Sequence, residues 1–397
     1  MRNAGLAAAA LLGCLLLAGC GTSAQPSPSA APVTVPAAVR TLYVQAPLSG
    51  PAVDEGRAMV DAVRLAVDQQ GGLAGKVRIV VRALDDGGAE AATDPARCAR
   101  NAATAAADPR ALAVIGTYEQ ACSESALKVL RPAGILLVSP LNGTPVLPGA
   151  LRLAPTLGDQ GGAVAQLARA LGATRIAVVS QRPGAAAEFE IGLAAEAHAN
   201  GVGPIEQLDA SAISARDIVA HLQAEHAEVV ALAGSPGAWS TRLLRELALL
   251  PKAVRPAVVA PQSFDTLAFL GSAGAAGEGV RVISRFVPAE QLGGSARSFA
   301  QAYADLHGEP PPVAAYAADA AGAVLDAAST AGASRPAVTR ALLTLPAHGG
   351  LLGRWAATPT GGITPRRLAV LVISAGAFRV ERVVSLADPL PSSGDLK

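Results

Sequence analysis

The feature that most constrains the fold is an alternation of short, continuous apolar runs with segments of helical periodicity. In residues 59–67, for example, Met59, Ala62, Val63 and Ala66 follow the spacing that lines one face of a helix. Continuous apolar runs are typical of strands buried on both faces, and helices between such strands indicate a parallel sheet with crossover connections. The sequence therefore predicts the α/β class. The predicted strands are residues 42–44, 77–84, 111–115, 135–138, 176–180, 229–233, 257–260, 280–283 and 368–373.

The composition allows a large core and argues against nucleic acid as a partner. Of the 397 residues, 51% are hydrophobic and 16% are charged, which suits two or three domains of ordinary size. The 32 Lys and Arg residues against 31 Asp and Glu residues leave a formal net charge of +1, without a basic run. Binding to a phosphate backbone requires a basic face, so we expect no nucleic-acid partner.

The N-terminus has the pattern of an export signal. Arg2 is followed by an apolar stretch over residues 4–18, shorter than the roughly 20 residues of a membrane-spanning helix. We expect residues 1–19 to be a cleaved signal peptide. Leu17-Ala18-Gly19-Cys20 resembles the bacterial lipobox, which predicts a lipid anchor on Cys20; an ordinary signal with an unrelated cysteine is the alternative. Residues 20–39, rich in Ser, Pro, Ala and Gly, are expected to form a flexible tether.

Two of the four cysteines remain for the folded part of the chain. Cys14 lies in the signal and Cys20 is the predicted lipid site, which leaves Cys98 and Cys122. In an oxidising, extracytoplasmic compartment such a pair most simply forms one disulfide. A metal or redox pair is the alternative, although the sequence has no Cys-x-x-Cys spacing and no histidine near either residue.

A search for catalytic and cofactor motifs finds none that is complete. Residues 71–76 suggest a phosphate-binding loop, but Gln70 and Val77 stand where that motif needs Gly and Ser or Thr. There is no Gly-x-Ser-x-Gly elbow. Asp85 and Asp86 follow a predicted strand, and we interpret them as a solvated turn, with catalysis as the alternative. We expect no catalytic residue, no metal and no cofactor. The histidines are expected to be surface or packing residues: His198, His221, His226, His307 and His348.

A series of short motifs follows in order over residues 41–385. It opens with Pro47-Leu48-Ser49-Gly50, continues through Val138-Ser139-Pro140, and closes with Ala315-Tyr316-Ala317-Ala318-Asp319-Ala320. The other members are residues 56–68, 71–75, 85–86, 114–117, 151–155, 176–179, 260–270, 277–280, 299–303 and 310–311. Their order and spacing resemble those of type I periplasmic binding proteins of the leucine/isoleucine/valine-binding group, which are extracytoplasmic receptors of amino-acid ABC importers.

The resemblance implies two doubly wound parallel-sheet lobes, joined by a three-crossing hinge, that close over a ligand in the cleft between them. Members of this group with cysteines at the corresponding positions also support the Cys98–Cys122 bridge. Lobe one would comprise residues 40–155 and 285–346, and lobe two residues 156–284 and 347–387, followed by a tail over residues 388–397.

The same resemblance implies that two loops of lobe one, residues 117–123 and 139–144, supply hydrogen-bond donors to the ligand. An amino acid carries a carboxylate and an ammonium group, so its site needs such donors and also an acceptor. The counterpart of the family's acidic residue in lobe two is Asp265. An ordinary turn or helix cap is the alternative for the loop residues. The expected ligand-binding residues are Tyr118, Gln120, Ser139, Asn142, Thr144 and Asp265.

Several positions depart from the family pattern. Gln120 stands where a serine is usual, and Glu119 would repel a carboxylate if it pointed inward. Residues 181–184 replace a segment that normally brings a tyrosine to the ligand, and Arg182 there would favour a more acidic ligand, with a surface position as the alternative. Trp239 is either a cleft wall or a packing residue. A standard branched-chain amino-acid specificity is therefore not expected.

Together these observations predict a monomeric, lipid-anchored solute-binding protein that captures a small polar ligand, an amino acid or a relative of one. Its partners would be this small molecule, an ABC permease and, through the lipid, the membrane. Three alternatives remain: a sensor or regulatory subunit with the same fold, an extracytoplasmic enzyme, and an envelope interaction protein. The last of these would show an exposed apolar patch.

Overall fold

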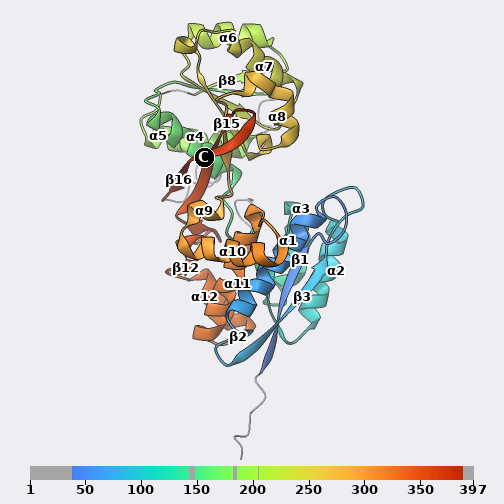
Figure 1. Ribbon diagram of the computed structural model, residues 1–397. Coiled ribbons are helices and arrows are strands. Elements are labelled where there is room, and N and C mark those ends of the chain that lie inside the picture. The colour runs from blue at the N-terminus through green and yellow to red at the C-terminus, as the bar shows by residue number, and fades with distance from the viewer. Residues whose placement is uncertain (1–37, 143–147, 182–185, 204, 388–397) are drawn as a thin grey trace, which may run out of the picture. The chain divides into compact units, whose positions relative to one another are not determined.

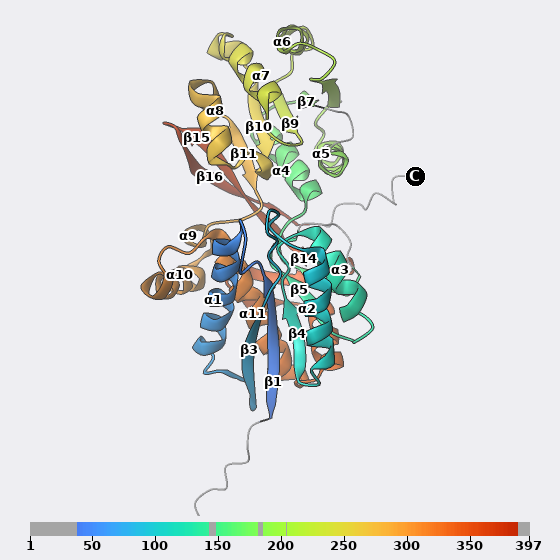
Figure 2. The same cartoon turned by 90° about the vertical axis from the view of Figure 1, so that its right-hand side faces the viewer.

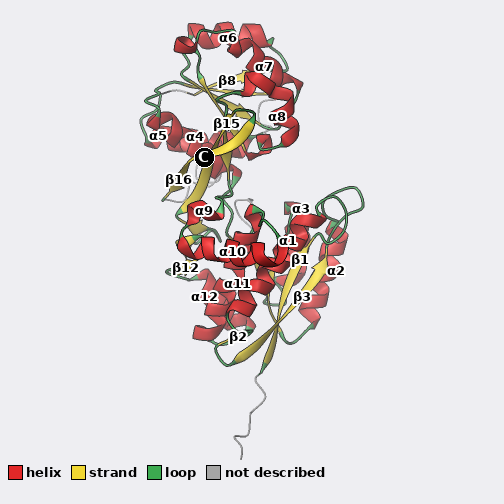
Figure 3. Cartoon of the chain, viewed as in Figure 1, coloured by secondary structure: helices red, strands yellow, loops and turns green. Residues whose placement is uncertain are grey.

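The apolar runs assemble into two separate sheets, of six and seven strands, and most strand pairs in them are parallel. The computed structural model describes residues 38–142, 148–181, 186–203 and 205–387. Helices flank the strands of each sheet (Figure 3), and none in this part of the chain is long and apolar enough to span a membrane. The α/β class and the two sheet lobes are thereby confirmed. The predicted features outside the described residues are the signal peptide, Cys20, most of the tether, Thr144, Arg182 and the tail.

The first sheet has the order β2-β3-β1-β4-β5-β6 and carries helices on both faces (Figures 1 and 2). In β1, Leu42 and Val44 belong to one hydrophobic core, with α1 and α11, whereas Tyr43 belongs to another, with α2 and α3. Because these residues are buried on both faces of the sheet, polar and apolar side chains do not alternate over residues 42–44. The strands are β1 (Val39–Ala46), β2 (Leu73–Ala74), β3 (Val77–Asp85), β4 (Ala111–Ile115), β5 (Leu136–Ser139) and β6 (Ala150–Arg152). The helices are α1 (Val53–Gln69), α2 (Pro95–Ala107), α3 (Gln120–Leu130), α9 (Ala289–Leu292), α10 (Gly294–His307), α11 (Pro312–Ala331) and α12 (Arg335–Leu343).

The second sheet has the order β16-β15-β11-β10-β9-β7-β8, with β15 and β16 antiparallel to their neighbours. Helices α4 and α5 contribute to the core on one face, and α6, α7 and α8 to the core on the other. Helices α4 and α5 touch backbone to backbone, since a Cβ on Gly192 would lie 2.0 Å from the carbonyl oxygen of Gly158. The strands are β7 (Ile176–Ser180), β8 (Ile205–Asp209), β9 (Val229–Ala233), β10 (Ala257–Pro261), β11 (Arg281–Ser284), β15 (Arg366–Ser374) and β16 (Ala377–Leu386). The helices are α4 (Leu157–Ala170), α5 (Ala187–Ala199), α6 (Ala215–Ala224), α7 (Ala238–Ala248) and α8 (Leu267–Ala273).

A small antiparallel sheet shifts one expected lobe boundary. Strands β12 (His348–Gly350), β13 (Gly353–Ala357) and β14 (Ile363–Thr364) form it, and Trp355 belongs to the core that also contains α11. The Trp355 indole donates a 2.8 Å hydrogen bond to the carboxylate of Asp319 on α11, which also accepts from the backbone N–H of Leu351. The chain therefore stays with the first lobe beyond residue 347 and joins the second sheet only at β15.

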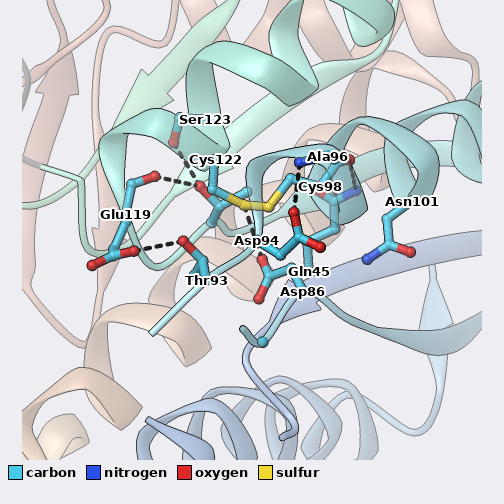
Figure 4. The surroundings of a disulfide bond; sticks show 12 residues. Gln45, Asp86, Thr93, Asp94, Ala96, Cys98, Asn101, Glu119, Cys122 and Ser123 are labelled. Carbon is cyan, nitrogen blue, oxygen red and sulfur yellow. Dashed lines mark hydrogen bonds between the residues drawn. A yellow bond between two sulfur atoms is a disulfide. The ribbon is translucent and has the colours of Figure 1, made fainter. Parts of the chain in front are cut away.

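The turn after β3 is buried, so its interpretation as a solvated turn is wrong. Asp85 accepts hydrogen bonds from the backbone N–H of Leu48 (2.8 Å) and the hydroxyl of Ser49 (2.7 Å), and it pairs with Arg97 at 2.8 Å. Asp86 is completely buried, and one carboxyl oxygen lies 3.3 Å from Sγ of Cys122 (Figure 4). Burial, together with the charge of Asp85, raises the pKa of Asp86 to about 7.

Cys98 on α2 and Cys122 on α3 form a disulfide, with their Cα atoms 5.4 Å apart (Figure 4). Both residues are fully buried, and the two helices pack closely on the same face of the first sheet. Cys122 lies in the first turn of α3, directly after the loop that follows β4. The crosslink therefore ties that loop to α2.

Candidate ligand-binding cleft

A cavity of about 850 Å³, here called the cleft, opens where strands of both sheets end. Residues that follow β4 and β5 of the first sheet line it together with residues that follow β9, β10 and β11 of the second. Ligands of open α/β sheets bind at such carboxyl ends of strands. The lining residues are Tyr118, Glu119, Gln120, Ala121, Leu141, Asn142, Leu157, Gln160, Ala186, Glu188, Gly234, Ser235, Gln262, Ser263, Arg285 and Phe286.

Of the six ligand-binding residues expected from the sequence, Tyr118, Gln120 and Asn142 line the cleft. Ser139 is buried at the end of β5, where its hydroxyl accepts a 3.1 Å hydrogen bond from the backbone N–H of Asn142. Ser139 therefore holds the loop that follows β5 and does not itself line the cleft. Asp265 follows a short 3-10 turn after β10, outside the lining, and burial raises its pKa. Thr144 lies outside the described residues.

The loop after β4 places its side chains in different environments. Gln120 is exposed and donates a 2.7 Å hydrogen bond to Glu124, one turn further along α3. Glu119 is also exposed, and its carboxylate accepts a 2.6 Å hydrogen bond from the hydroxyl of Thr93. Tyr118 packs against the core of the first sheet, and burial raises the pKa of its phenol. Its aromatic ring therefore forms a wall of the cleft, while Glu119 has a partner within its own lobe.

The second sheet supplies cleft residues that the sequence analysis missed. The side-chain oxygen of Gln160, on α4, accepts a 2.8 Å hydrogen bond from the backbone N–H of Gln262. The side-chain oxygen of Gln262 in turn accepts a 2.8 Å bond from the backbone N–H of Arg285. These bonds link α4 to the segments that follow β10 and β11. The signal that points to Gln262 and Arg285 is their position two residues beyond the predicted strands 257–260 and 280–283.

Two half-buried charged residues, Glu188 and Arg285, line the cleft. The Glu188 carboxylate accepts a 3.1 Å hydrogen bond from the backbone N–H of Gly158, at the start of α4. Burial nevertheless raises the pKa of Glu188. Burial also lowers the pKa of Arg285, against the opposing effects of Tyr118, Tyr316 and Glu188. The guanidinium of Arg285 lies over the ring of Phe286, 5.3 Å from its centroid.

Trp239 packs in the core of the second sheet and does not line the cleft. It is 5% exposed, meets Phe264 edge to face at 6.3 Å between ring centroids, and donates its indole N–H to the carbonyl oxygen of Ser235. The packing alternative for this residue is the one that the structure supports.

The sequence matches a family model described as periplasmic binding protein over residues 44–377. No functionally curated protein matches it. One similar solved structure is a putative branched-chain amino acid ABC transporter from Rhodospirillum rubrum, with 24% identity and a TM-score of 0.70, covering 86% of this chain and 99% of that one.

Two further solved structures contain ligands. An ABC transporter substrate-binding protein from Desulfitobacterium hafniense, in complex with Leu, is 18% identical with a TM-score of 0.68, covering 86% of this chain and 99% of that one. A solute-binding protein from R. palustris, in complex with benzoate, is 17% identical with a TM-score of 0.61, covering 89% of this chain and 98% of that one. At these identities the likeness concerns the fold.

Proposed function

The chain belongs to the periplasmic binding protein family, and we propose that it is a lipid-anchored, extracytoplasmic solute-binding protein of an ABC importer. It captures a small polar ligand, an amino acid or a relative of one, and delivers it to an ABC permease. It acts as a monomer, held at the membrane through Cys20, and performs no chemistry on its ligand.

The observation that carries this proposal is the composition of the cleft. Its lining combines neutral hydrogen-bonding side chains such as Asn142 and Gln262 with apolar walls such as Leu141 and Leu157. Small-molecule sites combine apolar walls with a few placed polar groups in this way. Because the lining comes from the strand ends of both sheets, a ligand in the cleft contacts both lobes and stabilises their closure.

The test is thermal unfolding of residues 21–397, prepared under oxidising conditions, in the presence of a broad panel of compounds. The panel contains amino acids and their amides, aliphatic and aromatic carboxylic acids, short peptides, polyamines and sugars. A ligand at 1,000 times its dissociation constant adds about 4 kcal/mol to the free energy of unfolding, a readily measured rise in melting temperature. A rise with one class of compound identifies the ligand. If no compound raises the melting temperature, the sensor or interaction alternative replaces the importer function.

The lipid anchor has its own test. Replacing Cys20 by alanine removes the only thiol to which the lipid would attach, so the variant should no longer incorporate labelled fatty acid. Labelling and fractionation of cells that express the wild type and the variant measure this. Cys14→Ala, within the predicted signal, is the matched control and should leave labelling unchanged. A Cys20→Ala protein that still carries the lipid would contradict the assignment.

A further inference from the structure

Arg285 is the charged residue of the cleft whose side chain has no hydrogen-bond or ion-pair partner among the described residues. Among the described residues, its guanidinium makes no hydrogen bond and no ion pair, and its Nε atom is buried without a hydrogen-bond acceptor. Glu119 and Glu188, the other charged residues of the lining, already accept hydrogen bonds from Thr93 and from Gly158. An Nε–H group that is buried without an acceptor is costly, and an anion that supplies acceptor atoms offsets that cost.

The backbone of Arg285 is held from both lobes. Its N–H donates to the side chain of Gln262 at 2.8 Å, and its carbonyl oxygen accepts from the hydroxyl of Tyr316, on α11, at 3.1 Å. The same hydroxyl accepts a 3.2 Å hydrogen bond from the backbone N–H of Val287. This segment leads from β11 of the second sheet to the helices of the first, so it is one of the crossings between the lobes. The backbone that carries the guanidinium is therefore held by hydrogen bonds to Gln262 and Tyr316.

Apart from Glu188, whose pKa is raised by burial, the groups around the guanidinium suit a carboxylate on an apolar body. Tyr118 lies close enough to interact electrostatically with Arg285, and its hydroxyl makes no hydrogen bond to another described residue. It can therefore donate to the same anion. Phe286, Leu141 and Leu157 supply apolar surface in the same cleft. The two parallel N–H groups of a guanidinium match the two oxygens of a carboxylate.

We propose that Arg285 binds the carboxylate of the ligand from the lobe crossing, and that the ligand is an organic acid with an apolar body. The inference rests on the proposed solute-binding function and narrows its ligand class. It makes the negative charge of the ligand, rather than an ammonium group, the main determinant of affinity.

The experiment compares matched acid and amide pairs: benzoate with benzamide, 4-methylpentanoate with 4-methylpentanamide, and leucine with leucinamide. Binding to residues 21–397 is measured by isothermal calorimetry and thermal shift. For the pair whose body fits the cleft, the acid should bind and the amide should bind at least about 10-fold more weakly. Arg285→Gln should weaken binding of the acid by about 10- to 100-fold, and Arg285→Lys by less, because a lysine keeps the charge without the fork of donors.

The unliganded melting temperature separates a binding role from a structural one. Because the Arg285 guanidinium makes no hydrogen bond and no ion pair among the described residues, Arg285→Gln should leave the melting temperature nearly unchanged, whereas loss of a structural residue would lower it. Arg245→Gln, which alters an exposed arginine on α7 outside the cleft, is the matched control and should bind as the wild type does.

The outcomes distinguish this inference from the proposed function. Equal binding of acid and amide, or an Arg285→Gln variant that binds the acid as tightly as the wild type, would overturn the role of Arg285. If only sugars, polyamines or other compounds without a carboxylate bind, the organic-acid class is wrong while the solute-binding function stands. If no compound of any class binds, both fail.

Discussion

Replacing Asp86 by asparagine should stabilise the protein at pH 8 and have little effect at pH 4. Asp86 is completely buried, and burial raises its pKa to about 7 in the folded protein, against an ordinary value of 3.8. The folded state therefore holds the proton over a range in which the unfolded chain has lost it. As the pH rises from about 4 to about 7, the free energy of unfolding of the wild type falls, and above that range this contribution stays lost.

The expected size of the effect follows from the displacement of the pKa. A rise of the pKa from 3.8 to about 7 lowers the free energy of unfolding of the wild type by roughly 4 kcal/mol at pH 8. The variant does not lose this amount, because asparagine is neutral at every pH. Chemical denaturation of the wild type and of Asp86→Asn at pH 4 to 8, without reductant, measures the difference. Parallel stability curves for the two proteins would show that Asp86 titrates normally.

Asp85→Asn is a contrasting variant, because the stability contributed by this neighbouring carboxylate has the opposite dependence on pH. Burial alone would raise the pKa of Asp85, but hydrogen bonds from Ser49, Gly87 and Leu48 and the charge of Arg97 hold it below its ordinary value. Its contribution to stability is therefore present above the unfolded pKa and is lost as the pH falls through the folded one. Asp85→Asn should destabilise the protein at neutral pH, and this loss should shrink as the pH falls below the ordinary value of 3.8. Loss of the Asp85 charge also lowers the pKa of Asp86, which offsets part of the destabilisation at neutral pH.

The contrast between these two adjacent residues shows where sequence reasoning stops. Asp85-Asp86-Gly87 after an apolar run has the composition of an exposed turn. Asp86 is buried because it lies beside the bridge between α2 and α3, so its environment depends on segments distant in the sequence. Local composition carries no information about whether distant segments of the chain bury a residue.

Strands of five residues that are buried throughout were predicted with their observed bounds, and most of the half-exposed β3 was also predicted, whereas the edge strand β16 was not. The ranges predicted for β4, β7 and β9 agree with the structure residue for residue, because every residue of each is buried. Strand β16 was missed because it mixes partly buried and exposed residues at the edge of its sheet. The small sheet of β12, β13 and β14 was missed because its strands are only two to five residues long.

For the cleft, the resemblance pointed to loop residues of the first lobe, among them Tyr118 and Asn142, which line the cavity. Arg285 was missed because its proposed role depends on the lack of a hydrogen-bond acceptor near its side chain, which a sequence does not reveal. A single arginine after an apolar run resembles any surface arginine, and only the packed structure shows that its Nε atom is buried and that its guanidinium has no hydrogen-bond acceptor among the described residues.

Removing the disulfide should have an effect on stability as large as that of Asp86. The bond joins residues 24 positions apart, and the chain-entropy model assigns roughly 3 to 4 kcal/mol to a loop of this length. Cys98→Ala/Cys122→Ala should lose about this amount in denaturant unfolding at pH 5, where Asp86 is neutral. Reductant should destabilise the wild type and leave the double variant unchanged. A loss below about 1 kcal/mol would show that packing of α2 against α3 alone holds these helices together.

The same change should also reach the cleft, because Cys122 lies in the first turn of α3 and Tyr118 to Ala121 line the cavity directly before it. Without the bond, that loop is tied to α2 only by noncovalent contacts, so ordering it on ligand binding costs more and affinity should fall. Calorimetry on the double variant, with a ligand identified for the wild type, measures this loss.

The stabilisation by Asp86→Asn should shrink in the double variant, because loss of the disulfide admits water to the Asp86 carboxyl and lowers its pKa. Full additivity of the two effects would mean that the disulfide does not control the burial of Asp86.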